Sequence, residues 1–210
     1  MKNMMVILIS LAALNAINAE KVTYSINEGH YEEAVTFTSK APLETIVGKT
    51  SKIHGFVTFD LNDITAGATG EFSVDLANLK TGIGLRDRHM RENHLETEIF
   101  PEAKFVLRSV KTNGNADLSD GFAKELTLEG DFSLHGVTLP KSISAVVKYI
   151  AEPNPSDIKI PGPLVHIQAQ FEIMLADYKI KRPQFLVMKL EEKQTINLDF
   201  YVSSETEVKD

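Results

Sequence analysis

The sequence predicts an all-β fold: an up-and-down antiparallel β-barrel of about eight strands, with a short helix near residues 82–97. Apolar residues recur with the period of two that is typical of strands, rather than the period of 3.6 that is typical of helices. About nine such segments follow one another, most of them separated by turn-forming pairs such as Asn62-Asp63 and Asn113-Gly114. Several run to about ten residues, and long strands with few helices favour a barrel over a short-stranded sandwich.

The first 19 residues are expected to form a secretory signal peptide, and residues 20–210 a single barrel domain. Lys2 supplies a positive start, Met4–Leu14 an apolar core, and Ala16–Ala19 a cleavage site. This stretch is too short to predict a stable membrane anchor. The chain contains no cysteine and therefore no disulfide, so we expect a bacterial periplasmic protein rather than a small extracellular eukaryotic one.

The net charge of −7 restricts the classes of partner. Nucleic acids are excluded because phosphate binding requires a basic face. Docking on anionic lipid through charge alone is also disfavoured. Most of this charge is explained by solubility.

The N-terminal half of the chain contains five of the alternating segments, each with one apolar face. In "TGEFSVDLANL", for example, Phe72, Val74 and Leu76 share a face and the residues between them are mostly polar. One apolar and one polar face is typical of antiparallel sheet with one side open to water. The inward residues of the five segments are Val22, Tyr24 and Ile26; Val35 and Phe37; Ile53, Val57, Phe59 and Leu61; Phe72, Val74 and Leu76; and Phe105 and Leu107.

The C-terminal half contains four longer alternating segments. The inward residues of these are Leu126, Leu128, Gly130, Phe132 and Leu134; Ile143, Ala145, Val147 and Tyr149; Val165, Ile167, Ala169, Phe171 and Ile173; and Ile196, Leu198, Phe200 and Val202. A sheet with so many strands and no helical partner must close on itself or pack as two layers.

Two segments lack the alternation. Residues 82–97 offer the pairs Asp87–Arg91 and Arg88–Glu92 at i,i+4 spacing, which supports a short helix. Residues 152–163 carry four prolines and predict a long, stiff connection across an end of the barrel.

Three motifs stand out in the sequence: "TGIGLRDRHMRENHLETEIFPEAKF" (81–105), "GDFSLHGVTLP" (130–140) and, more weakly, "YSINEGH" (24–30). The distinctive residues of the first two are Arg86, Asp87, His89, Met90, Arg91, Pro101, Ala103 and Phe105, and Leu134, His135, Gly136, Val137, Thr138 and Pro140. With these residues the three motifs together resemble the pattern of the YceI family of exported bacterial proteins.

The resemblance implies a lipocalin-like barrel with a long apolar channel. It implies that the protein binds polyisoprenoid lipids, including isoprenoid quinones, in the periplasm, and it implies no known catalytic activity. Members often form dimers, so the resemblance allows a homodimer. The chain departs from the family pattern in residues 37–59 and in "LADYKIKRP" (175–183), where a channel mouth is expected, and these departures bear on the ligand more than on the fold.

The candidate ligand-binding residues are members of the inward apolar set. By pattern alone such a set favours ordinary core residues in a filled barrel, and a hollow barrel that holds a small ligand stays open as the alternative. The candidates are Phe37, Phe59, Phe72, Val74, Phe105, Leu107, Leu128, Phe132, Ile167, Phe171 and Phe200.

Arg86, Asp87 and His89 are the candidates for the rim of the channel. Two roles are open for them. They can satisfy free backbone groups of a short helix that crosses the barrel end, or they can meet the polar headgroup of a lipid whose tail lies inside.

Metal binding and catalysis are less favoured. His89 and His94 are five residues apart and would point to different sides of a helix. The His-Glu-x-x-His spacing, a Gly-x-Ser-x-Gly elbow and a phosphate-binding glycine loop are all absent from the sequence. We therefore predict no metal ligands, no catalytic residues and no cofactor other than a bound lipid.

The predicted function is that of a periplasmic carrier, with a polyisoprenoid or an isoprenoid quinone as its hydrophobic small-molecule partner. Three alternatives are also compatible with the sequence: a binder of other long-chain amphiphiles such as fatty acids or their amides, a stress-related protein that acts through its surface, and a lipid-modifying enzyme.

Overall fold

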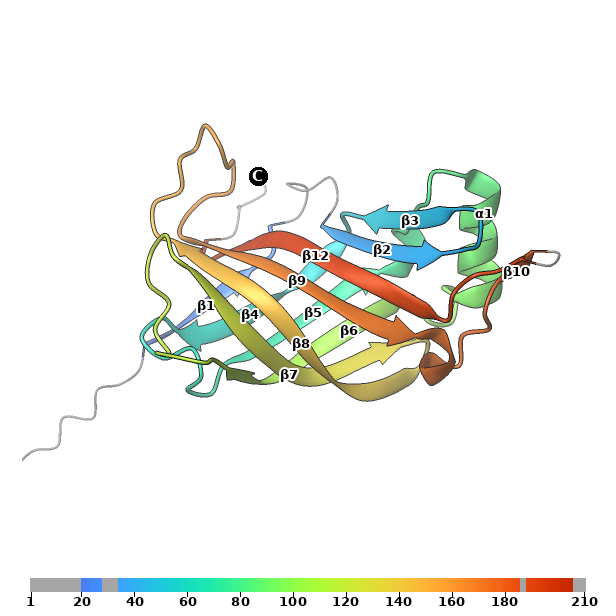
Figure 1. The fold of residues 1–210 in the computed structure, drawn as a ribbon. Coiled ribbons are helices and arrows are strands. Elements are labelled where there is room, and N and C mark those ends of the chain that lie inside the picture. The colour runs from blue at the N-terminus through green and yellow to red at the C-terminus, as the bar shows by residue number, and fades with distance from the viewer. Residues whose placement is uncertain (1–19, 28–33, 186–187, 206–210) are drawn as a thin grey trace, which may run out of the picture.

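The computed structural model describes residues 20–27, 34–185 and 188–205. The expected signal peptide, residues 1–19, lies outside them. Within these residues ten strands form one antiparallel sheet, and eight of the strands close into a barrel (Figure 1). The strands are β1 (Lys21–Ser25), β2 (Val35–Lys40), β3 (Thr45–Thr50), β4 (Ile53–Asp60), β5 (Thr69–Asp75), β6 (Glu102–Lys111), β7 (Ala123–Leu134), β8 (Val137–Ile150), β9 (Leu164–Met174) and β12 (Lys193–Ser203). The prediction of an all-β up-and-down barrel is confirmed.

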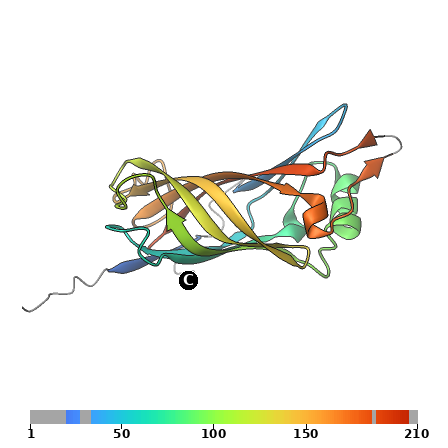
Figure 2. The same ribbon diagram turned by 60° about the horizontal axis from the view of Figure 1, so that its bottom comes forward.

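The helical elements are short. They are η1 (Leu76–Asn78), α1 (Gly84–His89), η2 (Met90–His94) and η3 (Leu175–Tyr178), and α1 continues directly into η2, which is one turn of π-helix. The predicted helix near 82–97 is therefore confirmed. A separate ribbon, β10 (Gln184–Phe185) and β11 (Met188–Lys189), projects beyond the barrel beside these helices (Figures 1 and 2).

The barrel closes through β12, which has two partners along one edge. Neighbouring strands run in the order β1, β4, β5, β6, β7, β8, β9 and β12, and Ser203 of β12 pairs with Ser25 of β1 to complete the ring. The other half of β12, from Gln194 to Leu198, pairs instead with β2. The β2–β3 hairpin therefore lengthens the wall at the end of the barrel where α1 lies (Figure 1).

This hairpin was not part of the sequence-based prediction beyond Val35 and Phe37. It is fixed at its outer edge by Lys49 and Lys80, whose backbones exchange two hydrogen bonds of 2.8 and 3.0 Å. At its centre Gly48 leaves room for the Phe37 ring: a Cβ atom on Gly48 would lie 2.0 Å from Cε1 of Phe37, so a larger residue there would displace the ring.

The register of the long strands keeps the predicted apolar faces inside. Phe105 pairs with Phe132 across β6 and β7, and Leu198 pairs with Ala169 across β12 and β9. A slip of one residue would turn every apolar side chain of a strand toward water. A β-bulge between Leu107 and Ser109 shifts the alternation of β6 and brings Val110 inward. The sequence pattern did not predict this bulge.

The end of the barrel away from α1 is closed by packed side chains. The Tyr24 ring stacks on Phe59 with 5.1 Å between centroids, and its other contact is edge-on with Tyr149 at 6.4 Å. Leu118, from the β6–β7 connection, is buried in the same core. The proline-rich connection 152–163 lies at this end and not over α1 (Figure 1), and its Pro163 carbonyl accepts a hydrogen bond of 3.1 Å from the Ser204 backbone.

Candidate functional site

The interior of the barrel holds an apolar cavity of about 690 Å³. This volume lies within the range of about 300–1,000 Å³ that is typical of small-molecule sites. The barrel is therefore hollow over part of its length, a point that the alternation of the sequence could not decide.

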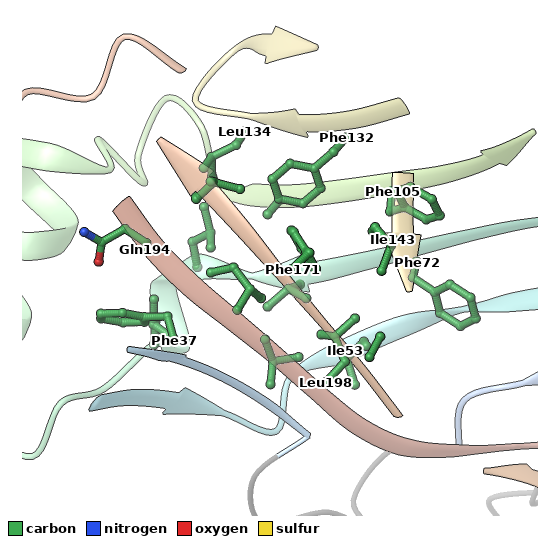
Figure 3. A pocket seen from close by; sticks show the side chains of 18 of the residues that line it. Phe37, Ile53, Phe72, Phe105, Phe132, Leu134, Ile143, Phe171, Gln194 and Leu198 are labelled. Atoms are coloured by element: carbon green, nitrogen blue, oxygen red, sulfur yellow. The ribbon is translucent and has the colours of Figure 1, made fainter. Parts of the chain in front are cut away.

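All eleven predicted ligand-binding residues line this cavity: Phe37, Phe59, Phe72, Val74, Phe105, Leu107, Leu128, Phe132, Ile167, Phe171 and Phe200. They come from β2, β4, β5, β6, β7, β9 and β12, so strands from most of the circumference form the cavity wall, part of which is shown in Figure 3. Their contact with a ligand stays a prediction.

Aromatic rings shape the cavity wall. Phe132 makes edge-on contacts with Phe171 at 5.4 Å and with Tyr178 at 5.6 Å between centroids. Phe72 and Phe200 form a tilted pair at 5.3 Å. Such pairs prefer edge-on and offset geometries, and they hold the rings of the wall against one another around the empty space.

The lining of the cavity extends to exposed residues at the end of the barrel where α1 lies. Leu43 follows β2, and Ile83 and Leu85 lie at the start of α1; their exposed fractions are 83%, 54% and 61%. All three line the cavity. We therefore identify this end as the mouth, and its lip is apolar.

The predicted rim motif is mainly a structural clasp. Asp87 Oδ1 accepts hydrogen bonds from the backbone N–H of Thr81 at 2.7 Å and from its hydroxyl at 2.5 Å. Arg86 Nε donates to the Thr81 hydroxyl at 2.8 Å, and Arg91 donates to the Leu79 carbonyl at 3.2 Å. These contacts fasten the segment that leaves the barrel to the helix that follows it.

Of the three predicted rim residues, Arg86 and His89 line the cavity but Asp87 does not. Asp87 is only 6% exposed. Asp87 therefore acts behind the rim, where it satisfies a backbone N–H at the start of the helical segment, and it does not face the cavity. A buried carboxylate requires hydrogen-bond donors, which Thr81 supplies, and sequence spacing alone did not show that the partner lies six residues upstream.

The second motif fastens the opposite side of the mouth. His135 and Gly136 form the two-residue β7–β8 turn with φ angles of 50° and 73°, as the tight hairpin turn requires. His135 Nε2 lies 2.7 Å from Glu96 Oε2, and its Nδ1 lies 3.1 Å from the Tyr178 carbonyl oxygen. The motif therefore joins the turn to the segments after η2 and within η3.

Sequence reasoning missed several residues of the cavity lining, among them the two polar residues that lie on barrel strands, Ser39 of β2 and Gln194 of β12. Each continues the alternation of a strand that was recognised: Ser39 follows Val35 and Phe37, and Gln194 precedes Ile196. Extending the period of two without regard to polarity would have found them.

Metal and membrane signals are absent from the described part of the chain. In residues 20–27, 34–185 and 188–205 no three His, Cys, Asp or Glu side chains lie close enough together to hold a metal ion. Over the same residues no helix is both long and apolar enough to cross a membrane.

Comparison with known sequences finds matches over most of the barrel. The model of a family described as the YceI-like domain matches residues 24–203. A UPF0312 protein of Shewanella denitrificans is 32% identical over 138 residues, which are 65% of this chain and 66% of that protein. Protein YceI of Escherichia coli O157:H7 is 29% identical over 137 residues, 65% of this chain and 64% of that protein. These alignments thus span about two thirds of the length of the curated relatives.

Solved structures share the fold at low sequence identity. A polyisoprenoid binding domain from Saccharophagus degradans has a TM-score of 0.64 at 15% identity, covering 89% of this chain and all of that one. BcnA of Burkholderia cenocepacia has a TM-score of 0.59 at 11% identity, covering 80% of this chain and 95% of that one. At such identities the likeness shows the barrel architecture alone.

Proposed function

The chain belongs to the family of YceI-like domains, and from this premise we propose that it is a periplasmic carrier of a polyisoprenoid or an isoprenoid quinone. The observation that carries the proposal is the cavity of about 690 Å³, which aliphatic and aromatic side chains line from the barrel core to an apolar lip. One of the structural neighbours is itself described as a polyisoprenoid binding domain, which supports the same ligand class.

The chemistry of the cavity suits a hydrocarbon chain. Burial contributes about 0.8 kcal/mol per methylene, so one five-carbon isoprene unit contributes about 4 kcal/mol. Three units contribute about 12 kcal/mol, against an association cost of at least about 4 kcal/mol. Because that cost is a lower limit, the difference is at most about 8 kcal/mol, which corresponds to a dissociation constant of about 1 μM at the tightest. Burial alone can therefore hold a hydrocarbon chain of this length with up to about micromolar affinity.

A carrier role, with no reaction of the ligand, is consistent with the contacts of the polar residues near the mouth. Arg86 and Asp87 hold Thr81, and His135 holds the β7–β8 turn. These side chains are committed to contacts within the protein. The expected signal peptide and the lack of cysteine support the periplasm as the compartment.

The proposal is tested by extracting the ligand. The full chain is expressed in a bacterial host, purified without detergent and extracted with organic solvent, and the extract is analysed by mass spectrometry. We expect a lipid series whose members differ by five-carbon units. A predominance of fatty acids or their amides would assign the cavity to another class of amphiphile, and an extract free of lipid would contradict the carrier function.

A further inference from the structure

We propose that Ser39 and Gln194 form a polar subsite that binds one uncharged oxygen group of the ligand, a carbonyl or a hydroxyl, while the hydrocarbon tail fills the deeper cavity. The inference rests on the proposed function and adds to it the chemistry and the position of the headgroup. It starts from Ser39, which lines the cavity and is 2% exposed.

The hydroxyl of Ser39 lacks a partner. Among the residues that the structure describes, its Oγ is the one buried side-chain nitrogen or oxygen atom without a hydrogen bond. Buried polar groups in proteins are nearly always paired, because leaving one unpaired costs free energy. Ser39 is aligned with Val35 and Phe37 on the cavity side of β2, so a bound molecule can supply the missing partner.

Gln194 is the direct neighbour of Ser39 across the β2–β12 pair. Residues opposite each other in an antiparallel pair have Cβ atoms about 4.5–5.5 Å apart. On either side of this pair lie Ile46 of β3 and Ile173 of β9, and all four side chains line the cavity. The polar pair is thus a small patch within an apolar wall.

The amide of Gln194 is held in place. Its Nε2 donates a hydrogen bond of 2.8 Å to the Glu191 carbonyl, and the Glu191 backbone N–H donates one of 2.7 Å to the carbonyl of Lys40, the last residue of β2. A fixed side chain loses little freedom when a ligand binds. The patch therefore presents prepositioned groups that can both donate and accept.

The position of the patch gives the ligand a direction. The next inward pairs on the same two strands are Phe37 with Ile196 and Val35 with Leu198. Figure 3 shows Gln194 beside Phe37 on the side toward the helix, while Phe132, Phe171 and Leu198 lie farther along the barrel. A molecule whose oxygen meets Ser39 and Gln194 therefore places its tail in the deep cavity and its headgroup near the mouth.

The charges at the mouth favour an uncharged headgroup. The guanidinium of Arg86 lines the cavity, but its Nη1 lies 3.2 Å from Glu44 Oε2 and its Nε donates to Thr81. A carboxylate ligand would have to compete with Glu44. A quinone carbonyl or a prenol hydroxyl needs only the uncharged pair.

The experiment compares Ser39→Ala with a control in the full chain. Thr38→Val is the control because it is nearly isosteric and alters the neighbouring residue of β2, which lies off the cavity face. The probes are geranylgeraniol, a ubiquinone with a short isoprenoid tail, the twenty-carbon hydrocarbon that lacks oxygen, and palmitate. Dissociation constants are measured by calorimetry, and thermal unfolding confirms that both variants fold.

We expect Ser39→Ala to weaken binding of the prenol or the quinone about five- to tenfold, which corresponds to the loss of one hydrogen bond. Binding of the hydrocarbon should stay unchanged, and Thr38→Val should bind every probe like the wild type. Whichever oxygenated probe responds identifies the source of the oxygen.

The subsite is overturned if Ser39→Ala leaves the binding of both oxygenated probes unchanged, which is the result expected if the Ser39 hydroxyl binds only water. It is also overturned if Ser39→Ala weakens binding of the hydrocarbon by the same factor. Palmitate that binds as tightly as the oxygenated probes would overturn the uncharged assignment. Failure of the wild type to bind any isoprenoid probe would instead contradict the proposed function, so the two failures are distinguishable.

Discussion

Asp87 and Thr81 are joined by two hydrogen bonds to one carboxylate oxygen, from the Thr81 backbone at 2.7 Å and from its hydroxyl at 2.5 Å. The pair fixes the start of the helical segment at the cavity mouth. Because Asp87 is buried, these bonds are shielded from competing water. The motif of residues 81–105, which resembles the family pattern, therefore helps to shape the mouth of the cavity.

Replacing Asp87 by Ala should destabilise the protein by about 1–3 kcal/mol, because the Thr81 donors lose their acceptor. For a chain of this size the melting temperature should fall by about 2–4 °C per kcal/mol. Calorimetry checks this. Glu92→Ala is the matched control, since it removes an exposed carboxylate from the adjoining η2. Equal effects of the two variants would mean that the hydrogen bonds between Asp87 and Thr81 do not stabilise the protein.

Phe132→Asp should prevent folding or ligand retention. Phe132 lies on the cavity wall between Phe171 and Tyr178, and a carboxylate there loses its hydration at a cost of several kcal/mol. Ser133→Asp should change stability little, because the Ser133 hydroxyl bonds Thr138 on the outer face. Urea unfolding and the lipid content of the purified variants measure both effects. Similar damage at the two positions would contradict the assignment of the faces.

The sequence predicted the barrel well where strands are long and one face is wet. In β7, β9 and β12 each inward residue is apolar or glycine from Leu126 to Leu134, from Val165 to Ile173 and from Ile196 to Val202, so alternation identifies the faces. It failed at the β2–β3 hairpin, where Ser39 and Gly48 face inward and break the apolar pattern.

The nature of the site was harder to predict for a physical reason. Whether a barrel is filled or hollow depends on how the volumes of facing side chains add up across the interior, and alternation along a strand carries no such information. The role of Asp87 likewise depends on a partner that only the folded chain brings near. The spacing of residues within a motif could therefore indicate the family, but it could not predict which residues contact one another in the folded chain.

Alkaline pH should destabilise the protein through Tyr24. Burial, and then the neighbouring Tyr149, raise the pKa of Tyr24 above its ordinary value of 10.0. The unfolded state therefore releases this proton at a lower pH than the folded state does, and the contribution of Tyr24 to stability is complete below about pH 10 and declines above it. Tyr24→Phe should show a shallower loss of unfolding free energy between about pH 9 and about pH 11. Identical slopes in denaturant titrations of the two proteins would contradict this role.

Filling the cavity should separate ligand binding from folding. Ala169 lines the cavity on β9 between Ile167 and Phe171, and its small side chain leaves space in front of it. Ala169→Phe places a ring in that space, so the protein gains apolar contacts while the ligand loses volume. We expect a folded protein that retains at most a small fraction of the lipid found in the wild type, as measured by mass spectrometry of solvent extracts. Gln168→Phe, which adds the same ring on the outer face, should retain lipid normally. If Ala169→Phe keeps its full lipid content, the ligand lies elsewhere, and the barrel interior is not the carrier site.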